Sequence, residues 1–436
     1  MNKNNLALLE RDDLKYVSVC FIDSLGQIRS KLISKAKVLK AIESSNGGGF
    51  NVALPSLALG YGDTQIGIDG ISSELDKFGD VPSKIDMESF REIPWIDKNQ
   101  NVLGFLELEG EHSIYCTRSI LKKSLANSKK NNIYPRFGIE FEFTLFDESI
   151  LSLEEKNYSN IKTTTNNSSY NLLHRQNEQS DFYNSLCKSA EIMNIDVEAF
   201  HEEMGAGFME VALNSGCDIK TADDAILIKH IIKQSALRLG KMASFMAKWS
   251  DKADGQSGHI HISLQNQLKE NLFLKNENFF DSFIAGLQEY IPELMLLLAP
   301  NNNSYKRYQP DIFSPIKNDW GWDNRKVAFR AIEGNNKRIE NRVPGADMNP
   351  YLGIASSILS GVAGIENNLK IKSDKEIELL PKTILEASNK IKNSKFANKV
   401  FDKDFIDYFN EFRVKENKTE IMLVSDIEKR RLIEFS

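Results

Sequence analysis

Hydrophobic and polar residues alternate most regularly along residues 135–146. Every second position is apolar, and these positions share one side of a predicted β-strand: Phe137, Ile139, Phe141, Phe143 and Leu145. The other side carries Glu140 and Glu142, whose carboxylates would lie roughly 6–7 Å apart. Two carboxylates this close repel each other unless a cation lies nearby. The segment therefore predicts either a solvated acidic edge strand or one wall of a cation site.

The first part of the chain predicts a small mixed domain that ends near residue 110. In chain order we expect a short helix or tail (1–11), a hairpin of two strands (15–23 and 28–33), a helix (34–44) and a further strand (102–109). Residues 50–85 are rich in Gly, Ser and Asp, which predicts loops.

Residues 111–436 predict a larger domain. We expect helices at 117–130, 181–193, 221–240 and 279–298, and strands at 135–146, 196–200, 243–248, 259–264, 325–332 and 337–343. Residues 159–169 are polar and low in complexity, which predicts a surface loop, and the chain after residue 350 is mostly helical. Strands interrupted by helices, after a small mixed domain, indicate the α+β class.

Composition changes this picture little. The 436 residues are 41% hydrophobic and 27% charged, which is typical of a globular protein of two or three domains. A net charge of −6 without a basic block argues against nucleic-acid binding. The four cysteines show no C-x-x-C spacing, and no apolar run is long enough for a signal peptide or a membrane span. We expect a cytoplasmic protein with no membrane partner.

Two further segments carry polar residues that would converge on the acidic strand. Glu203 and Glu210 flank a glycine-containing turn, so they would approach each other from neighbouring strands. His259, His261 and Ser263 share one face of the next predicted strand. An isolated H-x-H is more often a pair of structural histidines than a site, so both interpretations stay open for this segment.

The segment 337–342 alternates in the same way. It places Arg338, Glu340 and Arg342 on one face, a pattern that a surface salt-bridge ladder also produces. Carboxylates and imidazoles from four strands suit Mg²⁺ or Mn²⁺ rather than a closed zinc site. Arginines around divalent ions favour phosphoryl transfer from a nucleotide. The chain has no Walker A sequence, G-x-G-x-x-G or kinase signature, so a nucleotide would be held in another way.

Taken together, these segments resemble the glutamine synthetase superfamily, class I. Five blocks carry the resemblance in the family's order: GIEFEF, HEEMGAGFME, GQSGHIHIS, NNNSYKR…NDWGWDNRKVAFR and KRIENRVPGADMNPYL. The resemblance implies a β-grasp N-terminal domain at 1–110 and a catalytic domain at 111–436, with a curved antiparallel sheet and flanking helices. It also implies a homo-oligomer, usually a dodecamer, with active sites between adjacent subunits.

The resemblance further implies the residues of the site. One metal would be held by Glu142, Glu203 and Glu210, and a second by Glu140, His259 and Glu340. Glutamate would bind at Gly255, Arg307 and Arg342, the transferred phosphate at Arg325 and Arg330, and the nucleotide at Glu198, His261, Ser263 and Arg338. The implied reaction is attack of the glutamate γ-carboxylate on ATP, which gives γ-glutamyl phosphate, followed by displacement of phosphate by an amine. Two or more Mg²⁺ or Mn²⁺ ions would neutralise charge.

Two departures from the family pattern concern the amine. Six residues after Arg307, where glutamine synthetases carry a glutamate that helps to deprotonate ammonium, this chain has Phe313. Asp80 matches one of the two acidic residues that bind ammonium and is a candidate catalytic residue, but the sequence ALPS at 53–56 occupies the region of the other. An aromatic side chain in the amine pocket disfavours a small bare cation and suits an amine with a carbon body.

The sequence therefore favours a ligase that joins glutamate to an organic amine. The GHIHIS and GWDNR variants resemble those of γ-glutamyl-polyamine and other γ-glutamyl-amine ligases. One alternative is glutamine synthetase proper, and another is a non-catalytic relative, although no metal ligand or phosphate-binding arginine is missing. Residues 368–382 lack the tyrosine that adenylylated members carry, so that control is expected to be absent.

Overall fold

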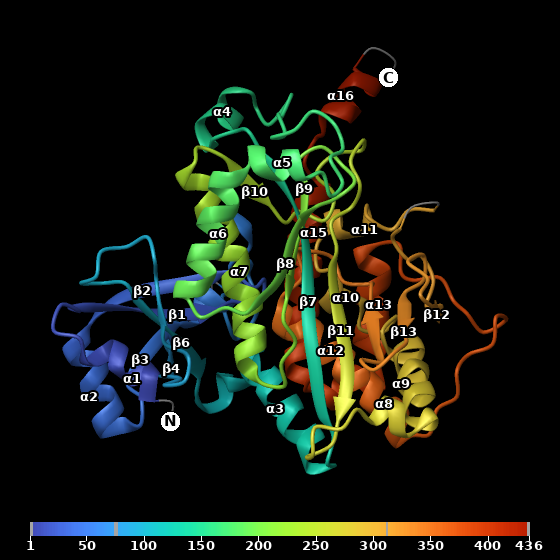
Figure 1. Ribbon diagram of the computed structural model, residues 1–436, viewed down its shortest axis with the longest axis horizontal. Coiled ribbons are helices and arrows are strands. Elements are labelled where there is room, and N and C mark those ends of the chain that lie inside the picture. Colours follow the sequence, from blue (N-terminus) through green and yellow to red (C-terminus); the bar gives the residue numbers. More distant parts are fainter. Residues whose placement is uncertain (1–2, 74–76, 311–312, 434–436) are drawn as a thin grey trace.

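The computed structural model describes residues 3–73, 77–310 and 313–433, and its strands form two separate sheets (Figure 1). The N-terminal part of the chain, blue in Figure 1, builds the first sheet, and residues from 134 onward build the second. Helices pack beside both sheets, which confirms the α+β class. The β-grasp assignment and the domain boundary near residue 110 stay predictions.

The N-terminal sheet has the strand order β2-β1-β6-β4-β3, with β5 paired to β6. Its strands are Tyr16–Ile22 (β1), Ile28–Ser34 (β2), Phe50–Ala53 (β3), Asp80–Ile85 (β4), Arg91–Glu92 (β5) and Val102–Leu108 (β6). The predicted hairpin is confirmed, because β1 and β2 pair antiparallel from Tyr16 opposite Ser34 to Ile22 opposite Ile28. Every residue of β6 is buried, since this strand lies in the interior of the sheet beside β1 and β4.

The prediction of loops throughout residues 50–85 is wrong at both ends of that segment. Residues 50–53 and 80–85 form β3 and β4, which pair antiparallel. Both strands are short, and Pro82 lies inside β4, so the local signal is weak. The strands form because Val52 and Val81, which lie opposite each other, are both buried in the core. Between them lie two short 3₁₀ helices, Leu54–Ala58 and Tyr61–Asp63.

The second sheet has the order β12-β13-β14-β11-β7-β9-β8, with β10 paired to β7. Its strands are Tyr134–Phe146 (β7), Val197–Glu202 (β8), Phe208–Leu213 (β9), Met242–Ser244 (β10), Gly258–Gln265 (β11), Trp320–Trp322 (β12), Phe329–Ile332 (β13) and Arg338–Asn341 (β14). β7, teal at the centre of Figure 1, is the longest strand and lies between β11 and β9. The predicted alternation along β7 is confirmed, because its apolar residues are buried and Glu140 and Glu142 are partly exposed.

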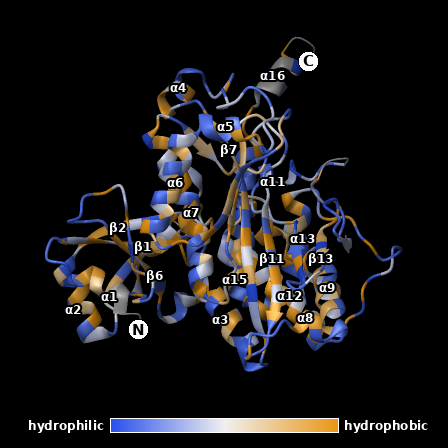
Figure 2. Ribbon diagram, viewed as in Figure 1, coloured by the Kyte–Doolittle hydropathy of each residue, from blue (hydrophilic) through white to orange (hydrophobic). Residues whose placement is uncertain are grey.

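Helices pack beside both sheets and form most of the C-terminal part of the chain. They are Lys3–Glu10 (α1), Lys35–Ser45 (α2), Thr117–Lys130 (α3), Ile150–Glu155 (α4), Leu173–Glu178 (α5), Ser180–Ile192 (α6), Ile219–Arg238 (α7), Leu272–Lys275 (α8), Glu277–Tyr290 (α9), Met295–Leu298 (α10), Asn302–Tyr305 (α11), Pro350–Glu366 (α12), Ile384–Asn393 (α13), Lys395–Val400 (α14), Lys403–Ile421 (α15) and Asp426–Leu432 (α16), with a 3₁₀ helix at Gly110–Tyr115. α3 and α7 contact β7, and α12 packs against α3 and α9. Hydrophobic residues gather along these inner elements, whereas the peripheral loops are mainly hydrophilic (Figure 2).

Three predicted elements of the second domain differ from the structure. The helix expected at 279–298 is two helices, α9 and α10, because Pro292 between them has no backbone N–H for a continuous helix. The strand expected at 243–248 is the short β10, and the chain then turns away so that the Gln256 side chain can donate to the carbonyls of Ser244 and Met246. The strand expected at 325–332 begins at Phe329, after an exposed turn.

A buried ion-pair network joins the two sheets. Arg118 of α3 is 1% exposed and donates to both oxygens of Asp223 on α7, at 2.8 and 2.9 Å. The same guanidinium donates to Asp86 at 2.7 Å and to Glu107 of β6 at 2.5 Å. These contacts hold the N-terminal sheet against the helices of the second sheet. None of the helices in the described residues has the length and hydrophobicity required to cross a membrane.

Candidate active site

The strand register of the second sheet brings the predicted acidic and histidine residues onto one face, called the acidic face below. Glu140 of β7 lies opposite His259 of β11, and His261 lies opposite Glu340 of β14. On the other side of β7, Glu142 lies opposite Glu210 of β9. Residues far apart in the chain therefore become neighbours through backbone pairing, because directly paired residues in antiparallel strands have Cβ atoms about 5 Å apart.

One group on this face consists of Glu140, His259 and Glu340. The Nδ1 atom of His259 lies 3.4 Å from Glu140 Oε2 and 3.4 Å from Glu340 Oε1. One potential ligand atom from each of the three residues lies within 4.8 Å of the others. His259 and Glu340 are almost completely buried, at 4% and 1% exposure, whereas Glu140 is partly exposed. This is the set that the family resemblance implies for the second metal.

The remaining predicted carboxylates form two overlapping groups around Glu210. Ligand atoms of Glu142, Glu210 and His259 lie within 4.8 Å of one another, and so do those of His201, Glu203 and Glu210. Glu142 also accepts a hydrogen bond from the backbone N–H of Ser257, at 2.5 Å.

His201 is the residue that the sequence reasoning missed. Its Nε2 lies 3.0 Å from Glu203 Oε1 and 3.4 Å from Glu210 Oε1. A signal was present, since His201 and Glu203 are two positions apart near the predicted strand at 196–200 and so share a face.

The acidic face carries unbalanced negative charge. Burial and the repulsion of Glu140, Glu142, Glu203 and Glu340 raise the pKa of Glu210 to about 10. Burial also opposes ionisation of Glu140, but His261 and His259 hold the pKa of this carboxyl well below its usual range. The Glu210 carboxyl is therefore neutral near pH 7 in this arrangement, and a bound cation would favour its ionised form.

The residues on this face fit divalent cations such as Mg²⁺ or Mn²⁺. Neither ring nitrogen of His259 has a hydrogen-bond partner among the described residues, although both are buried. A buried imidazole without a partner, facing carboxylate oxygens at 3.4 Å, is suited to coordinate a metal. Three or more carboxylates around one imidazole favour Mg²⁺ or Mn²⁺ over a structural zinc ion.

Arginines border the acidic face on its β13–β14 side. Arg330 donates to Glu340 at 3.1 Å and to Asp323 at 2.8 Å. Arg342, which is 5% exposed, also donates to Glu340. Arg338 donates from Nε to Nδ1 of His261, at 3.2 Å, and so orients the ring whose Nε2 lies 3.1 Å from Glu140. Fixed positive charge therefore lies directly beside the acidic group.

The residues predicted to bind glutamate also lie together. A Cβ atom at Gly255 would approach Arg307 Cγ to 2.2 Å, so only glycine fits against this arginine. Arg307 is fully buried and donates to the backbone carbonyls of Arg342, Val343 and Pro344. In this structure the Arg307 guanidinium therefore fixes the backbone of residues 342–344, which form one wall of the site.

Phe313 lies beside the same wall. Its side chain is 55% exposed, and its backbone carbonyl accepts a hydrogen bond from Arg342, at 3.3 Å. An exposed aromatic ring at this point supplies an apolar surface next to the arginines.

Four predicted residues are not drawn into these contacts. Arg325 and Glu198 are exposed, and Ser263 is buried opposite Arg136 of β7. Asp80 belongs to the N-terminal sheet, where it is exposed and accepts a hydrogen bond from Asn51, at 3.3 Å. The roles predicted for these residues stay predictions.

Comparisons with known proteins agree with this geometry. Residues 114–432 match the family model for the glutamine synthetase catalytic domain. The chain is 33% identical over 440 residues to the type-1 glutamine synthetase 2 of Dictyostelium discoideum, across 95% of this chain and 83% of that protein. It is 32% identical over 378 residues to the glutamate–isopropylamine ligase of Pseudomonas sp, across 82% of each chain. The solved structure of a GmaS/ADP complex shares the fold, with a TM-score of 0.84 at 22% identity over 100% of both chains. The protein belongs to the glutamine synthetase family.

Proposed function

We propose that this protein is an ATP-dependent ligase that joins the γ-carboxylate of L-glutamate to an organic amine through γ-glutamyl phosphate. The observation that carries the proposal is the group of Glu140, His259 and Glu340, whose ligand atoms lie close together. Arg330 and Arg342 both donate hydrogen bonds to the side chain of Glu340. Metal ligands and arginines placed side by side suit transfer of a phosphoryl group, whose negative charge both must neutralise.

The proposed roles follow from position on the acidic face. Glu142, Glu203 and Glu210, with His201, would hold one divalent ion, and Glu140, His259 and Glu340 another. Bound Mg²⁺ or Mn²⁺ would neutralise the phosphate oxygens of ATP and polarise the phosphoryl group. Arg330 would contact the transferred phosphate, because it already reaches Glu340 and Asp323 at the edge of the face. Arg342 would orient the glutamate carboxylate.

Phe313 supports an organic amine as the acceptor. Its exposed ring lies where the family pattern of glutamine synthetases has an acid, so the pocket offers apolar surface instead of a proton acceptor. The similarity to a glutamate–isopropylamine ligase points the same way. Ammonium is the second candidate acceptor, and the comparable identity to a type-1 glutamine synthetase favours it.

We also propose that the site is completed by a second copy of the chain. Asp80 is exposed on the N-terminal sheet, whereas the acidic face belongs to the second sheet. A neighbouring subunit would bring its Asp80 to the amine pocket, as expected for a ring-forming member of the family. Light scattering of the purified protein tests the expected dodecamer, and a monomeric protein with full activity would contradict it.

The direct test measures phosphate release from ATP with glutamate and a panel of amines. The panel contains ammonium, isopropylamine, ethanolamine and putrescine, each assayed with Mg²⁺ and with Mn²⁺. We expect release that depends on glutamate and on an organic amine. Release with ammonium alone would establish the second candidate, and no release with any acceptor would contradict both.

Phe313 offers a sharper test of the acceptor. We expect Phe313→Ala to raise the KM for the organic amine about tenfold, because loss of an apolar contact in a pocket costs about 1–3 kcal/mol. The KM for glutamate should stay nearly unchanged. Tyr158→Ala, at an exposed aromatic residue after α4, is the control. An unchanged amine KM in Phe313→Ala would remove Phe313 from the amine pocket.

A further inference from the structure

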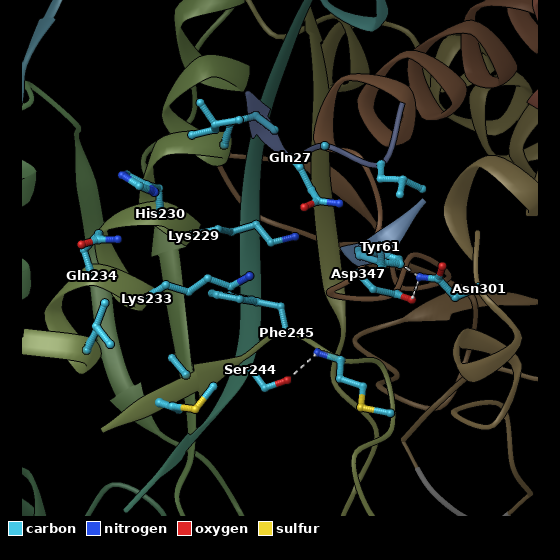
Figure 3. Close-up of a pocket in the computed structure, with 18 of the residues that line it drawn as sticks. Gln27, Tyr61, Lys229, His230, Lys233, Gln234, Ser244, Phe245, Asn301 and Asp347 are labelled. Carbon is cyan, nitrogen blue, oxygen red and sulfur yellow. Dashed lines mark hydrogen bonds between the residues drawn. The ribbon is translucent and has the colours of Figure 1, made fainter. Parts of the chain in front are cut away.

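A cavity lies between the N-terminal hairpin and helix α7 (Figure 3). It is on the side of β7 that carries Phe141, because the ammonium group of its lining residue Lys229 lies 4.8 Å from the centre of the Phe141 ring. Its volume is about 710 Å³, which is large enough for a small organic molecule. The turn between β1 and β2 forms one wall, α7 and β10 form another, and segments near Asn301 and Asp347 close the third. None of the candidate catalytic residues lines it.

Positively charged side chains from α7 enter this cavity. Lys229 and Lys233 are one helical turn apart, so their ammonium groups lie on the same face of the helix, and Figure 3 shows both side chains directed into the same space. Lys229 donates to the backbone carbonyl of Ala346, at 2.6 Å. The Lys233 side chain makes no hydrogen bond or ion pair with any residue in the described part of the chain. Two neighbouring ammonium groups without a carboxylate partner are costly unless an anion joins them.

The cavity also holds unpaired polar atoms opposite these lysines. The Nε2 atom of Gln27 is buried and lacks a hydrogen-bond partner among the described residues, and the side chain points from the hairpin turn toward Lys229 in Figure 3. Oδ1 of Asp347 is likewise buried and unpaired, whereas its Oδ2 accepts from Asn301 at 2.8 Å and from Ser304 at 2.6 Å. Buried polar atoms are normally paired, so both indicate a missing partner.

The charges around Lys229 do not balance within the protein. Burial and the nearby Lys233 lower the pKa of Lys229 to about 7, and Asp347 offsets them only in part. Lys241 also lines the cavity, and its Nζ lies 3.6 Å from Oδ1 of Asp147, which is outside the lining. The carboxylates that line the cavity are Asp347 and Glu420. His230 adds no charge near neutral pH, because burial lowers its pKa to about 4.

An apolar surface completes the cavity. Phe245 and Ile226 line its floor, and Lys229 lies 5.1 Å from the centre of the Phe245 ring. A ligand with only charge would leave this surface uncovered, whereas a carboxylate on a short hydrocarbon chain would cover it.

We propose that this cavity is a binding site for a small organic carboxylate, separate from the candidate active site. The carboxylate would accept hydrogen bonds from Lys229, Lys233 and Gln27, and its hydrocarbon part would lie on Phe245. A hydrogen-bond donor on the ligand would find Oδ1 of Asp347. Because the ligand contacts both the β1–β2 turn and α7, its binding stabilises the contact between the two parts of the chain.

Calorimetric titration of succinate tests the proposal at pH 6.5, where the Lys229 ammonium is mostly charged, and at constant ionic strength. We expect saturable binding that weakens about tenfold or more in the Lys229→Met, Lys233→Met double variant, because this variant loses both charge-assisted hydrogen bonds to the carboxylate. Gln27→Leu, from the opposite wall, should also weaken it. Lys188→Met, at an exposed lysine on α6, is the matched control and should bind like the parent.

The same titration with inorganic phosphate asks what kind of anion the cavity takes, and weaker binding than succinate is expected because phosphate leaves the apolar floor uncovered. Circular dichroism of each variant verifies that it is folded, and Gln27→Leu tests the site independently of the lysines. Succinate binding that persists in both the double variant and Gln27→Leu would overturn the proposal. Absence of saturable succinate binding to the parent protein would overturn it as well.

Discussion

Individual carboxylates on the acidic face have different protonation states because their neighbours differ. Glu140 lies beside two imidazoles, which lower its pKa, so it ionises readily. Glu210 lies beside other carboxylates, which raise its pKa to about 10, so it stays protonated near neutral pH. They lie on the adjacent strands β7 and β9, two residues out of direct register. A metal ion would reverse the environment of Glu210, because it would replace repulsion by attraction.

Glu140 tests the metal assignment. Glu140→Ala should lower phosphate release by at least about 100-fold, because even loss of a residue that only orients a metal ligand costs about 10–100-fold. The fold should be retained, since the substitution also removes repulsion on the face. Glu191→Ala, at an exposed position near the end of α6, is the control. Near-normal turnover of Glu140→Ala would show that the metal assignment is wrong.

Glu210 makes stability depend on pH in the absence of metal. Its pKa is raised above the ordinary value of 4.5, so the folded state binds a proton that the unfolded state has lost between pH 4.5 and about 10. The free energy of unfolding contributed by this group is therefore full below pH 4.5 and falls as pH rises toward 10. Each pKa unit corresponds to about 1.4 kcal/mol, so the effect is on the order of a few kcal/mol.

Thermal melts in EDTA at pH 5.5 and 8.5 measure this dependence. We expect a lower Tm at pH 8.5 for the parent, a smaller difference between the two pH values for Glu210→Gln, and recovery of the parent's Tm at pH 8.5 with Mg²⁺ or Mn²⁺. Identical pH dependence in the parent and in Glu210→Gln would contradict the raised pKa.

At the scale of elements, close packing of α9 against α12 depends on glycine. A Cβ atom at Gly286 of α9 would lie 2.2 Å from the Ser360 carbonyl oxygen and 2.8 Å from the Gly364 Cα atom of α12. These two helices form the most extensive contact between elements of the chain. The approach is possible only without side chains, so the glycines set the distance between the helices.

Gly286→Ala should therefore destabilise the protein by about 1–3 kcal/mol, the typical cost of overpacking a core. In an exposed helix the same change would stabilise it by about 1 kcal/mol, so the sign of the effect reports the contact. Gly67→Ala is the control, because nothing lies within 4 Å of its Cβ position and its φ is not positive. Urea unfolding measures both, and a stabilised Gly286→Ala would contradict the packing.

At the scale of the whole molecule, Arg118 links the two sheets through three carboxylates that would otherwise repel one another. Arg118→Ala would leave the buried Asp223 without an ionic partner, and would leave Asp86 and Glu107 with Lys122 alone. We expect a loss of about 3–5 kcal/mol in unfolding free energy, as for other broken buried ion pairs.

Arg175→Ala is the control for this change. Its ion pair with Glu178 lies on the surface, at 38% and 52% side-chain exposure, and should contribute at most about 1 kcal/mol. Denaturant unfolding compares the two variants. Equal stability of both would show that the Arg118 network does not hold the sheets together.

Much of the local structure could be predicted from the sequence. The alternation along β7, the β1–β2 hairpin and the long α7 each follow from a period of apolar residues within one segment. The short β3 and β4 could not, because each pairs with a strand far away in the sequence, with Ala53 opposite Asp80, and neither has a strong local pattern. The end of α9 before Pro292 could have been predicted from the proline, but the apolar residues on both sides of it favoured one continuous helix.

The kinds of residue in the candidate site were determined by the sequence alone, since the five blocks contain the carboxylates, histidines and arginines in order. Which of them become neighbours was decided by the tertiary structure, through the register that sets Glu140 opposite His259 and His261 opposite Glu340. The tertiary structure also places His201 beside Glu210 on the acidic face, and it places Lys229 and Gln27 on facing walls of one cavity. Local patterns specify which face a side chain occupies, but only packing of distant segments specifies what that face meets.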